Sequence, residues 1–338
     1  MGRQVGEASV ELERPVSIAV SASVVGTKEG QGPLGMLFDK VSEDDMFGAK
    51  NWEEAESTFQ KEALFLALKK GGFAPRDIRY LFAGDLLGQS IASSFGLGVY
   101  QIPFLGVYGA CSTCGEALTL GAMTIDGGFA DKVACVTSSH FASAEREFRF
   151  PLEYGNQRPK SATWTVTGSG AFILEKSEGK EGVKIMGMTV GKITDYGVKD
   201  SMNMGACMAP AAANTLLSHM KDWKRTPEDY DKIITGDLGE VGRTALMSLV
   251  KEKGLELSDR HMDCGLEIYE TEEQDCHSGG SGCGCCAVTL AAYILKQLRE
   301  KSWRRVLFMP TGALLSKTSF NEGRTVPGIC HALVLESY

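Results

Sequence analysis

The chain has 338 residues, and 35 Lys and Arg against 43 Asp and Glu give a formal net charge of −8 at pH 7. This acidic balance, with no basic block, argues against sequence-independent binding of nucleic acid. The hydrophobic fraction of 43% and the charged fraction of 23% are typical of a globular protein with a large core. Because no apolar run approaches the roughly 18–20 residues that span a bilayer, and none follows the N-terminus, we expect neither a transmembrane segment nor a secretory signal.

Ten cysteines in a long chain without a signal indicate a reducing compartment and free thiols, not a disulfide framework. Cys276, Cys283, Cys285 and Cys286 lie close together after Cys264. A zinc site built on the Cys283–Cys286 pair is one interpretation, but no second pair follows at the spacing of a zinc finger. We expect small buried thiols that pack a helix against a strand.

In the first half of the chain, apolar periodicity predicts strands and helices in alternation. The segment 141–159 carries many charged and aromatic residues, and we expect it to pass over the site. The predicted elements are a strand at 16–25, a loop at 27–42, a helix at 52–70, strands at 80–83 and 103–108, a helix at 111–125, and strands at 133–137 and 165–174.

The second half repeats this order more compactly. Its predicted elements are a strand at 183–190, a helix at 210–221, a strand at 232–235, helices at 243–253 and 286–299, and strands at 306–309 and 331–335. Alternation throughout the chain predicts an α/β fold with mostly parallel sheets that are covered by helices.

Two pairs of segments are internal copies of one another. PRDIRYLFAGDL at 75–86 matches PEDYDKIITGDL at 227–238, and GACSTCGEALTL at 109–120 matches GGSGCGCCAVTL at 279–290. Two matches in the same order predict a pair of halves related by a pseudo-twofold axis, with a site where equivalent turns converge. We place the halves at residues 1–178 and 179–338.

Cys111 is the sharpest chemical candidate in the sequence. It follows an apolar strand and a Gly-Ala turn and opens an apolar helix, a position that lowers the pKa of a thiol and attracts anions. The alternative is that Cys111 is only a small residue that fits a tight turn. Cys111 and Cys114 also form a CxxC pair, but the predicted burial of Cys114 disfavours thioredoxin-like redox chemistry.

Several polar residues follow predicted strands. Asp85 and Asp237 end equivalent strands, where carboxylates could bind a cation, orient a ligand or act as a base. Each could instead cap the turn or helix that follows it. His140 could donate a hydrogen bond to an anion or be a structural histidine. The glycine run at 279–284 is typical of a backbone nest for an anion, without the order of a nucleotide-binding motif.

Taken together, these residues resemble the thiolase and β-ketoacyl synthase superfamily. GACSTCGEAL at 109–118 is similar to the nucleophile turn of that superfamily, and the glycine-rich turn at 279–286 takes the place of its second-half active-site loop. The resemblance implies a five-layer αβαβα body made of two similar halves.

One branch of this superfamily, the stage V sporulation protein AD family, is more similar still, almost from end to end. The matching segments are GPLGMLFDK (32–40), AGDLLGQS (83–90), YGACST (108–113), TSSHFASAEREFRFPLEYG (137–155), TVTGSGA (165–171), MAPAAANT (208–215), DCGLEIY (263–269), GGSGCGC (279–285) and TGALLS (311–316). The resemblance implies binding of dipicolinic acid (pyridine-2,6-dicarboxylate) and its uptake, with calcium, into the developing spore together with other stage V sporulation membrane proteins. It implies a location in the cytoplasm or on the periphery of the forespore or spore inner membrane.

The departures from the synthases bear on catalysis. Those enzymes place two further groups beside the cysteine, His with His or His with Asn. This chain has Ile234-Thr235-Gly236-Asp237 at one of those places and Gly279-Gly280-Ser281 at the other. Loss of one oxyanion donor costs about 10²–10³-fold in rate, so the resemblance and its gaps together predict a pseudo-enzyme. The alternatives are a residual Cys111-dependent acyltransferase or thioesterase, and a scaffold with a vestigial pocket.

The sequence and the resemblance therefore predict a ligand-binding site and no catalytic residue beyond the nucleophile candidate Cys111. We expect no cofactor and no metal site of the protein's own, with calcium arriving only with the ligand, and a homodimer as in the superfamily. The predicted ligand-binding residues are Asp85, Cys111, Ser112, His140, Asp237, Gly280 and Ser281.

Overall fold

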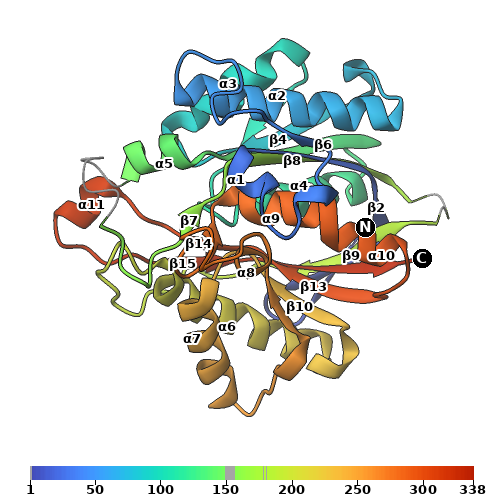
Figure 1. Ribbon diagram of the computed structural model, residues 1–338. Helices are drawn as coiled ribbons and strands as arrows, with labels where there is room; N and C mark the ends of the chain where they lie inside the picture. The colour runs from blue at the N-terminus through green and yellow to red at the C-terminus, as the bar shows by residue number, and fades with distance from the viewer. Residues whose placement is uncertain (1, 149–156, 178, 180) are drawn as a thin grey trace.

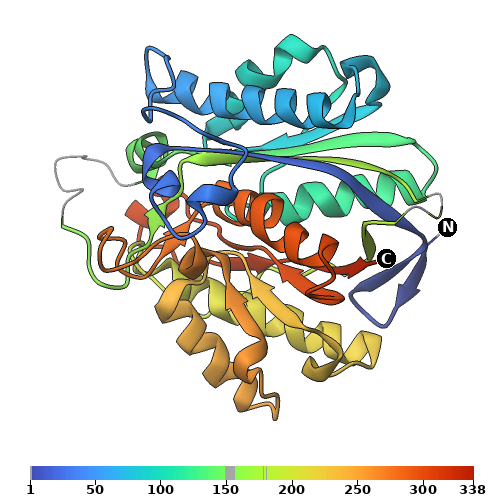
Figure 2. The ribbon, with the colours of Figure 1, turned by 45° about the vertical axis from the view of Figure 1, so that its right-hand side comes forward.

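The computed structural model describes residues 2–148, 157–177, 179 and 181–338. Figures 1 and 2 show five stacked layers, in which two sheets alternate with three layers of helices. Helices α2 (Trp52–Gly71) and α3 (Ile91–Leu97) cover the outer face of one sheet. Helices α6 (Met204–Trp223) and α7 (Gly239–Lys251) cover the other, while α4 (Thr113–Asp126), α9 (Cys283–Thr289) and α10 (Leu295–Arg299) lie between the sheets. The expected five-layer αβαβα fold is confirmed.

Strand order shows the relation between the two halves. The path through the sheets is β5-β4-β6-β8-β2 and then β9-β16-β13-β10-β11, so each set of five runs outward from the centre in the same connection order. The strands of the path are β5 (Phe104–Gly106), β4 (Tyr80–Gly84), β6 (Lys132–Ser139), β8 (Gly168–Lys176), β2 (Ser9–Val25), β9 (Val183–Thr189), β16 (Ala332–Ser337), β13 (Arg305–Met309), β10 (Lys232–Thr235) and β11 (His261–Asp263). The predicted boundary at 178 and 179 falls between β8 and β9 and stays a prediction.

The long strand β2 joins the two sheets. Its residues from Val16 to Val25 pair with β8, and its residues from Ser9 to Glu11 pair with β9. Val16 and Ser17 pair with both β8 and β9, after a register shift in the β9 pairing between Glu11 and Val16. One continuous strand therefore holds the two halves in a fixed relation.

The prediction of mostly parallel sheets is wrong. The pairs β4–β5, β4–β6, β10–β11 and β10–β13 are parallel. Antiparallel pairing connects the central strands β8, β2, β9 and β16 to one another. The same pairing connects β8 to β6 and β16 to β13. Strands buried on both faces have continuous apolar sequences in either direction, so the apolar pattern could not distinguish the two arrangements.

Helix α2 matches its prediction within one residue, and the structure shows why it begins and ends there. The Asn51 side chain accepts a hydrogen bond from Glu54 N at the first turn, and Gly72 ends the helix in the left-handed region at φ 67°. Helix α6 begins at Met204 and not at Pro210 as predicted, because Asn203 caps it and Pro210 lies inside it. Proline inside a helix removes one backbone hydrogen bond, and α6 continues through Pro210 nonetheless.

The remaining differences are local. The predicted loop at 27–42 contains two short helical turns and a two-residue strand, and the predicted strand at 165–174 is split into β7 and β8. Of the segment 141–159, residues 149–156 lie outside the described residues, and 141–148 form helix α5 (Phe141–Phe148). The short elements not yet named are α1 (Thr27–Gly30), α8 (Cys264–Glu267), α11 (Lys317–Asn321), β1 (Arg3–Val5), β3 (Lys40–Val41), β7 (Trp164–Thr165), β12 (Gly280–Ser281), β14 (Thr311–Ala313) and β15 (Gly328–Cys330).

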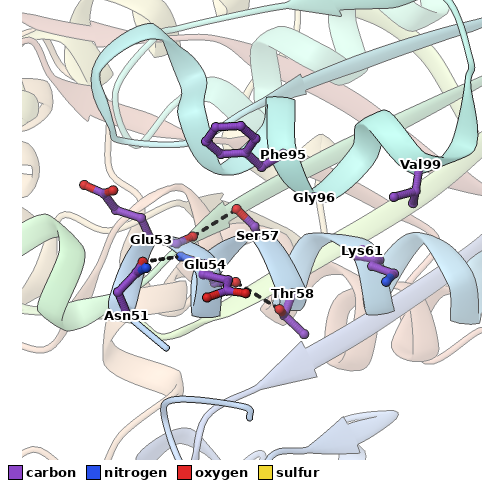
Figure 3. Close-up of a pocket in the computed structure, with 9 residues that line it drawn as sticks. All are labelled: Asn51, Glu53, Glu54, Ser57, Thr58, Lys61, Phe95, Gly96 and Val99. Carbon is purple, nitrogen blue, oxygen red and sulfur yellow. Dashed lines mark hydrogen bonds between the residues drawn. The ribbon is translucent and has the colours of Figure 1, made fainter. Parts of the chain in front are cut away.

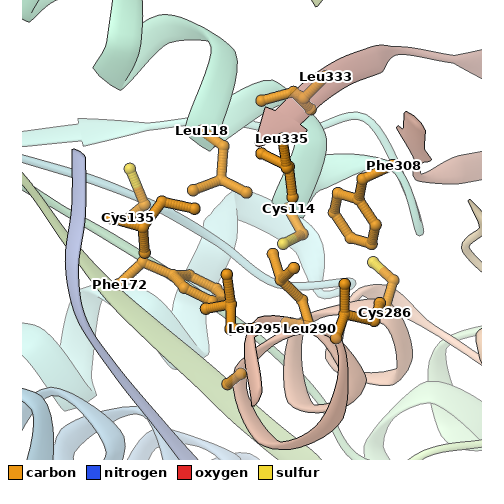
Figure 4. Packing of buried hydrophobic residues seen from close by; sticks show 14 of the residues in the cluster. Cys114, Leu118, Cys135, Phe172, Cys286, Leu290, Leu295, Phe308, Leu333 and Leu335 are labelled. Carbon is orange, nitrogen blue, oxygen red and sulfur yellow. The ribbon is translucent and has the colours of Figure 1, made fainter. Parts of the chain in front are cut away.

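The central helical layer forms the main core. Figure 4 shows Cys114 and Leu118 of α4 facing Cys286 of α9 and Leu290, with Phe308 and Leu333 beside them. All ten cysteines are free, buried thiols, in agreement with the expectation of thiols that pack the core. Among the described residues, no helix has both the length and the apolar character that crossing a membrane requires.

Candidate functional site

Cys111 lies at a sharp turn before α4. The preceding residue, Ala110, has φ 50°, a left-handed conformation that is uncommon for a residue with a side chain. Ser112 Oγ donates to Gly109 O at 2.7 Å and closes the turn. A Cβ atom on Gly312 would lie 2.4 Å from Gly109 O, so the β14 backbone approaches this turn too closely for any other residue. The strained turn and the close approach fix the thiol at the start of α4.

The thiol opens onto a small cavity between the two halves. The cavity volume is about 20 Å³, enough for about one water molecule. Apart from Cys111, its lining includes the hydroxyl-bearing residues Tyr108, Thr165 and Ser281. The apolar side of the lining is formed by Leu86, Ala110, Ala144, Phe148, Met204, Ala313 and Leu315.

A larger hollow of about 460 Å³ lies elsewhere, between α2 and α3. Figure 3 shows Phe95 and Val99 on one side of this hollow and Glu53, Glu54 and Lys61 on the other. It contains none of the predicted site residues. The chemistry that the sequence indicates is therefore at the smaller cavity.

The side chain next to the thiol is a hydroxyl that is backed by a carboxylate. Ser281 Oγ lies 3.8 Å from Cys111 Sγ and donates to Asp237 Oδ2 at 2.9 Å. Asp237 also accepts hydrogen bonds from Gly282 N at 3.1 Å and from Thr311 Oγ1 at 2.7 Å. No histidine or asparagine is among the described residues that line the cavity.

This arrangement disfavours a thiolate. Burial raises the pKa of Cys111 well above its ordinary value, and the Asp237 carboxylate raises it further by like-charge repulsion with the thiolate. Burial also raises the pKa of Asp237, although hydrogen bonds from Thr311 and its other partners oppose that shift. The position at the start of α4 therefore does not produce the activated thiol that the sequence suggested for it.

Of the two duplicated aspartates, only Asp85 caps the turn that follows its strand, the alternative that the sequence left open for both. In the turn after Asp237, Leu238 N and Gly239 N donate to Asp263 instead. Asp85 accepts from Leu87 N at 2.9 Å, from Ser93 N at 2.9 Å and from Ser93 Oγ at 2.6 Å. Asp237 reaches across to Gly282 N in the glycine turn. The predicted anion nest at 279–284 thus already holds a carboxylate of the protein itself.

The other predicted residues are placed apart from the cavity. His140 lies against the backbone, with Nε2 2.7 Å from Asp45 O and Nδ1 accepting from Ala142 N at 3.1 Å. Burial lowers the pKa of His140, so the ring is neutral near pH 7. Ser112 closes the Cys111 turn, and Gly280 is buried in β12. Only Cys111 and Ser281 of the predicted set line the cavity.

One polar group near the cavity was not predicted. Glu56 on α2 is 0% exposed, and it accepts from Ser138 Oγ at 2.8 Å and from Ser143 Oγ at 2.6 Å. In the sequence Glu56 lies within an amphipathic helix among other charged residues. The sequence signal that could have revealed this buried carboxyl group is the position of Glu56 on the apolar side of the predicted helix at 52–70. Across the described part of the chain, no three His, Cys, Asp or Glu residues are arranged to hold a metal ion.

Comparison with known proteins identifies the family. The model of the stage V sporulation protein AD family matches residues 6–336. The chain belongs to this family. The stage V sporulation protein AD of Bacillus subtilis (strain 168) is 44% identical over 331 residues, which cover 98% of this chain and 97% of that protein.

Solved structures of condensing enzymes share the fold. The 3-oxoacyl-[acyl-carrier-protein] synthase III of Aquifex aeolicus superposes with a TM-score of 0.58 at 12% identity, covering 95% of this chain and 99% of that one. Cerulenin-bound OleA of Xanthomonas campestris gives 0.60 at 15% identity, covering 96% and 97%. At such identities the likeness establishes the thiolase-type fold and carries no activity over to this chain.

Asp237 and Ser281 should shift the pKa of Cys111 in opposite directions. Alkylation of Cys111 by iodoacetamide, followed across pH 7–10 by peptide mass mapping, should shift to lower pH in Asp237→Asn by about one unit, because a like charge is removed. It should shift to higher pH in Ser281→Ala, because a Ser281 hydroxyl that turns from Asp237 to the thiolate lowers the pKa of Cys111. A profile that neither substitution moves would show that the carboxylate does not control this thiol.

Proposed function

We propose that this protein binds dipicolinic acid in the Cys111 cavity without catalysing a reaction, and so supports uptake of that ligand with calcium into the developing spore. In this role it acts with membrane partners from the same group of sporulation proteins, from the cytoplasm or from the periphery of the forespore or spore inner membrane. The absence of catalysis is inferred from one observation: the serine next to the thiol, Ser281, is hydrogen-bonded to the Asp237 carboxylate. The ligand itself comes from the family resemblance.

The electrostatics explain why condensation is disfavoured at this cavity. A synthase must stabilise a developing oxyanion with hydrogen-bond donors and must supply a nucleophile. Here the thiol is held protonated by burial and by Asp237, and Ser281 already donates its proton to that carboxylate. The same residues can still contact a bound molecule without reacting with it.

Binding requires the walls of the cavity to separate. A cavity of roughly 150 Å³ accommodates benzene, whereas this one has about 20 Å³. Leu86, Phe148 and Met204 are the large apolar side chains that close it and have to move. The hydroxyl groups of Tyr108 and Ser281 and the first turn of α4 are then the groups that would contact carboxylates.

Calcium would make the ligand easier to accommodate. Asp237 places a carboxylate beside the cavity, and the whole chain has a net charge of −8. Both charges repel a bare dianion, whereas one Ca²⁺ neutralises the two carboxylates of the ligand. The proposal therefore favours the chelate as the species that is moved.

A second candidate is a residual Cys111-dependent acyltransferase or thioesterase. The observation that favours it is the preserved turn, in which Ala110 has φ 50° and Cys111 opens α4. Such a turn presents a side chain for attack on an acyl group. This candidate must overcome the raised pKa of Cys111 and the missing imidazole or amide.

We also propose that the protein forms a homodimer through β5. All three residues of this strand are exposed, with Phe104 at 41% and Leu105 at 48%, and among the described strands it pairs only with β4. Phe95 on the neighbouring helix α3 is 71% exposed. An apolar strand at the edge of a sheet is a site for pairing with another chain. Two copies related by a twofold axis would pair their β5 strands and cover these side chains.

Titration calorimetry should show saturable binding of dipicolinate to the wild-type protein. Ala144→Leu, which fills the cavity, should weaken the affinity about tenfold or more, since overpacking costs about 1–3 kcal/mol. Ala142→Leu on the same helix α5 does not line the cavity and is the matched control. Absence of saturable heat, or equal affinities for the two variants, would remove this cavity as the binding site.

Light scattering coupled to size-exclusion chromatography should give the mass of a dimer for the wild-type protein. Leu105→Glu should shift it to the monomer, because it buries an unpaired charge at the proposed contact. Phe129→Glu substitutes another exposed aromatic residue, away from β5, and should stay dimeric. A monomeric wild-type protein would contradict the proposed interface.

A further inference from the structure

Behind one wall of the cavity lie two buried carboxyl groups that a chain of hydrogen bonds connects. Glu56 and Asp85 are both 0% exposed. Ser138 Oγ donates to Glu56 Oε1 at 2.8 Å, and Ser93 Oγ donates to Asp85 Oδ2 at 2.6 Å. Gln60 Nε2 lies between them, 2.8 Å from Ser138 Oγ and 2.9 Å from Ser93 Oγ. The two carboxyl groups therefore belong to one network.

Among the described residues, no cationic side chain donates a hydrogen bond to Glu56 or Asp85. Ser138 and Ser143 donate to Glu56, and Leu87 N and Ser93 donate to Asp85. Two unpaired carboxylates this deeply buried are costly, since nearby like charges disfavour ionisation of both groups. In addition, Gln60 Oε1 is buried without a partner among the described residues, so one further hydrogen-bond acceptor is present in this network.

The charged groups on the surrounding elements do not neutralise the pair. Lys132 of β6 lies at the other end of the strand from Ser138, beside Glu175 of β8, which pairs with it in register. Lys176 ends β8, and the charged residues of β2 precede Val16, again remote from Ser138. Helix α3 carries no charged residue, and the cations Arg146 of α5 and Lys61 of α2 are exposed. Glu53, one turn before Glu56 on α2, adds further negative charge.

The titration of the pair agrees with this geometry. Burial raises the pKa of Glu56 to about 8, and the negative charge of Asp85 is the next cause. Burial raises the pKa of Asp85 as well. Near neutral pH the two groups together therefore hold a proton, which belongs to the pair and not to one residue.

The same hydrogen bonds hold two walls of the cavity. Glu56 Oε2 accepts from Ser143 Oγ at 2.6 Å, and the next residue, Ala144, lines the cavity. Asp85 Oδ1 accepts from Leu87 N at 2.9 Å, and the preceding residue, Leu86, lines it too. The charge of the pair also reaches the site. Burial is the main cause that raises the pKa of the lining residue Tyr108, and the negative charge of Asp85 adds to that shift.

We propose that Glu56 and Asp85 form a proton-holding pair that positions two walls of the Cys111 cavity and couples binding of an anionic ligand there to uptake of a proton. This inference rests on the proposed function. A ligand anion near the pair repels its ionised form and favours the protonated one. The affinity for the anion therefore falls as pH rises through the titration of the pair.

The proton held by the pair should also make the stability of the ligand-free protein depend on pH. The pKa of Glu56 is raised from 4.5 to about 8 on folding, so the folded state binds more protons than the unfolded state between these pH values. The free energy of unfolding should accordingly decrease as pH rises across this window. Glu56→Gln removes that titration, and its stability should depend less on pH.

The test is calorimetry with calcium-free dipicolinate at pH 7–9, in two buffers that differ in ionisation enthalpy. The wild-type protein should take up a fraction of a proton, up to about one, and its affinity should fall by up to tenfold per pH unit above the titration of the pair. Glu56→Gln should bind without proton uptake. Free dipicolinate does not interfere, because ordinary carboxyl groups are fully ionised in this range.

Two control variants separate this pair from other carboxyl groups. Glu53→Gln, on the same helix, and Glu29→Gln, whose buried carboxyl has a pKa raised to about 7, should both keep the proton uptake. Binding with no proton uptake, or uptake that persists in Glu56→Gln, would overturn this inference and leave the proposed function intact. Binding of the calcium chelate alone would overturn the coupling and leave the proposed function intact. Absence of binding of both free dipicolinate and the chelate by the wild-type protein would overturn the proposed function and, with it, the coupling.

Discussion

The Asp237 carboxylate, held beside Cys111 by Ser281, Gly282 and Thr311, is the interaction on which the account of this site depends. It occupies the glycine turn before α9 and places negative charge beside the thiol. Since a carboxylate opposes both a thiolate and an oxyanion, one side chain removes two requirements of the chemistry. In the proposed non-catalytic role, the fold and the strained Cys111 turn are kept while the thiol stays protonated.

Internal duplication explains how such a site arises at the junction of the halves. Asp85 and Asp237 end equivalent strands, and each is buried and accepts backbone N–H groups of a nearby turn. The two copies differ in their neighbours. Asp85 is linked through serines and Gln60 to Glu56, whereas Asp237 is linked through Ser281 to Cys111. Asp85 thus belongs to a carboxyl pair behind the cavity wall, whereas Asp237 lies near the thiol.

Much of the fold was predictable from the sequence because the repeats mark equivalent strands, and 232–235 was predicted without error. Strand direction was not, since buried strands have the same apolar pattern in either direction. At the site, the turn that carries Cys111 was readable from a local motif. The contact between Asp237 and Gly282, the placement of His140 against Asp45 O, and the inward position of Glu56 depend on contacts between distant segments.

The most direct test of the central claim is exposure of the protein to acyl-CoA substrates of several chain lengths, with intact mass and peptide mapping as the readout. The account predicts no acyl adduct on Cys111 and no turnover of the thioester, because the thiol is protonated and its carboxylate neighbour cannot donate to an oxyanion. An acyl group on Cys111, together with turnover that Cys111→Ala abolishes, would contradict the account and make this protein an enzyme.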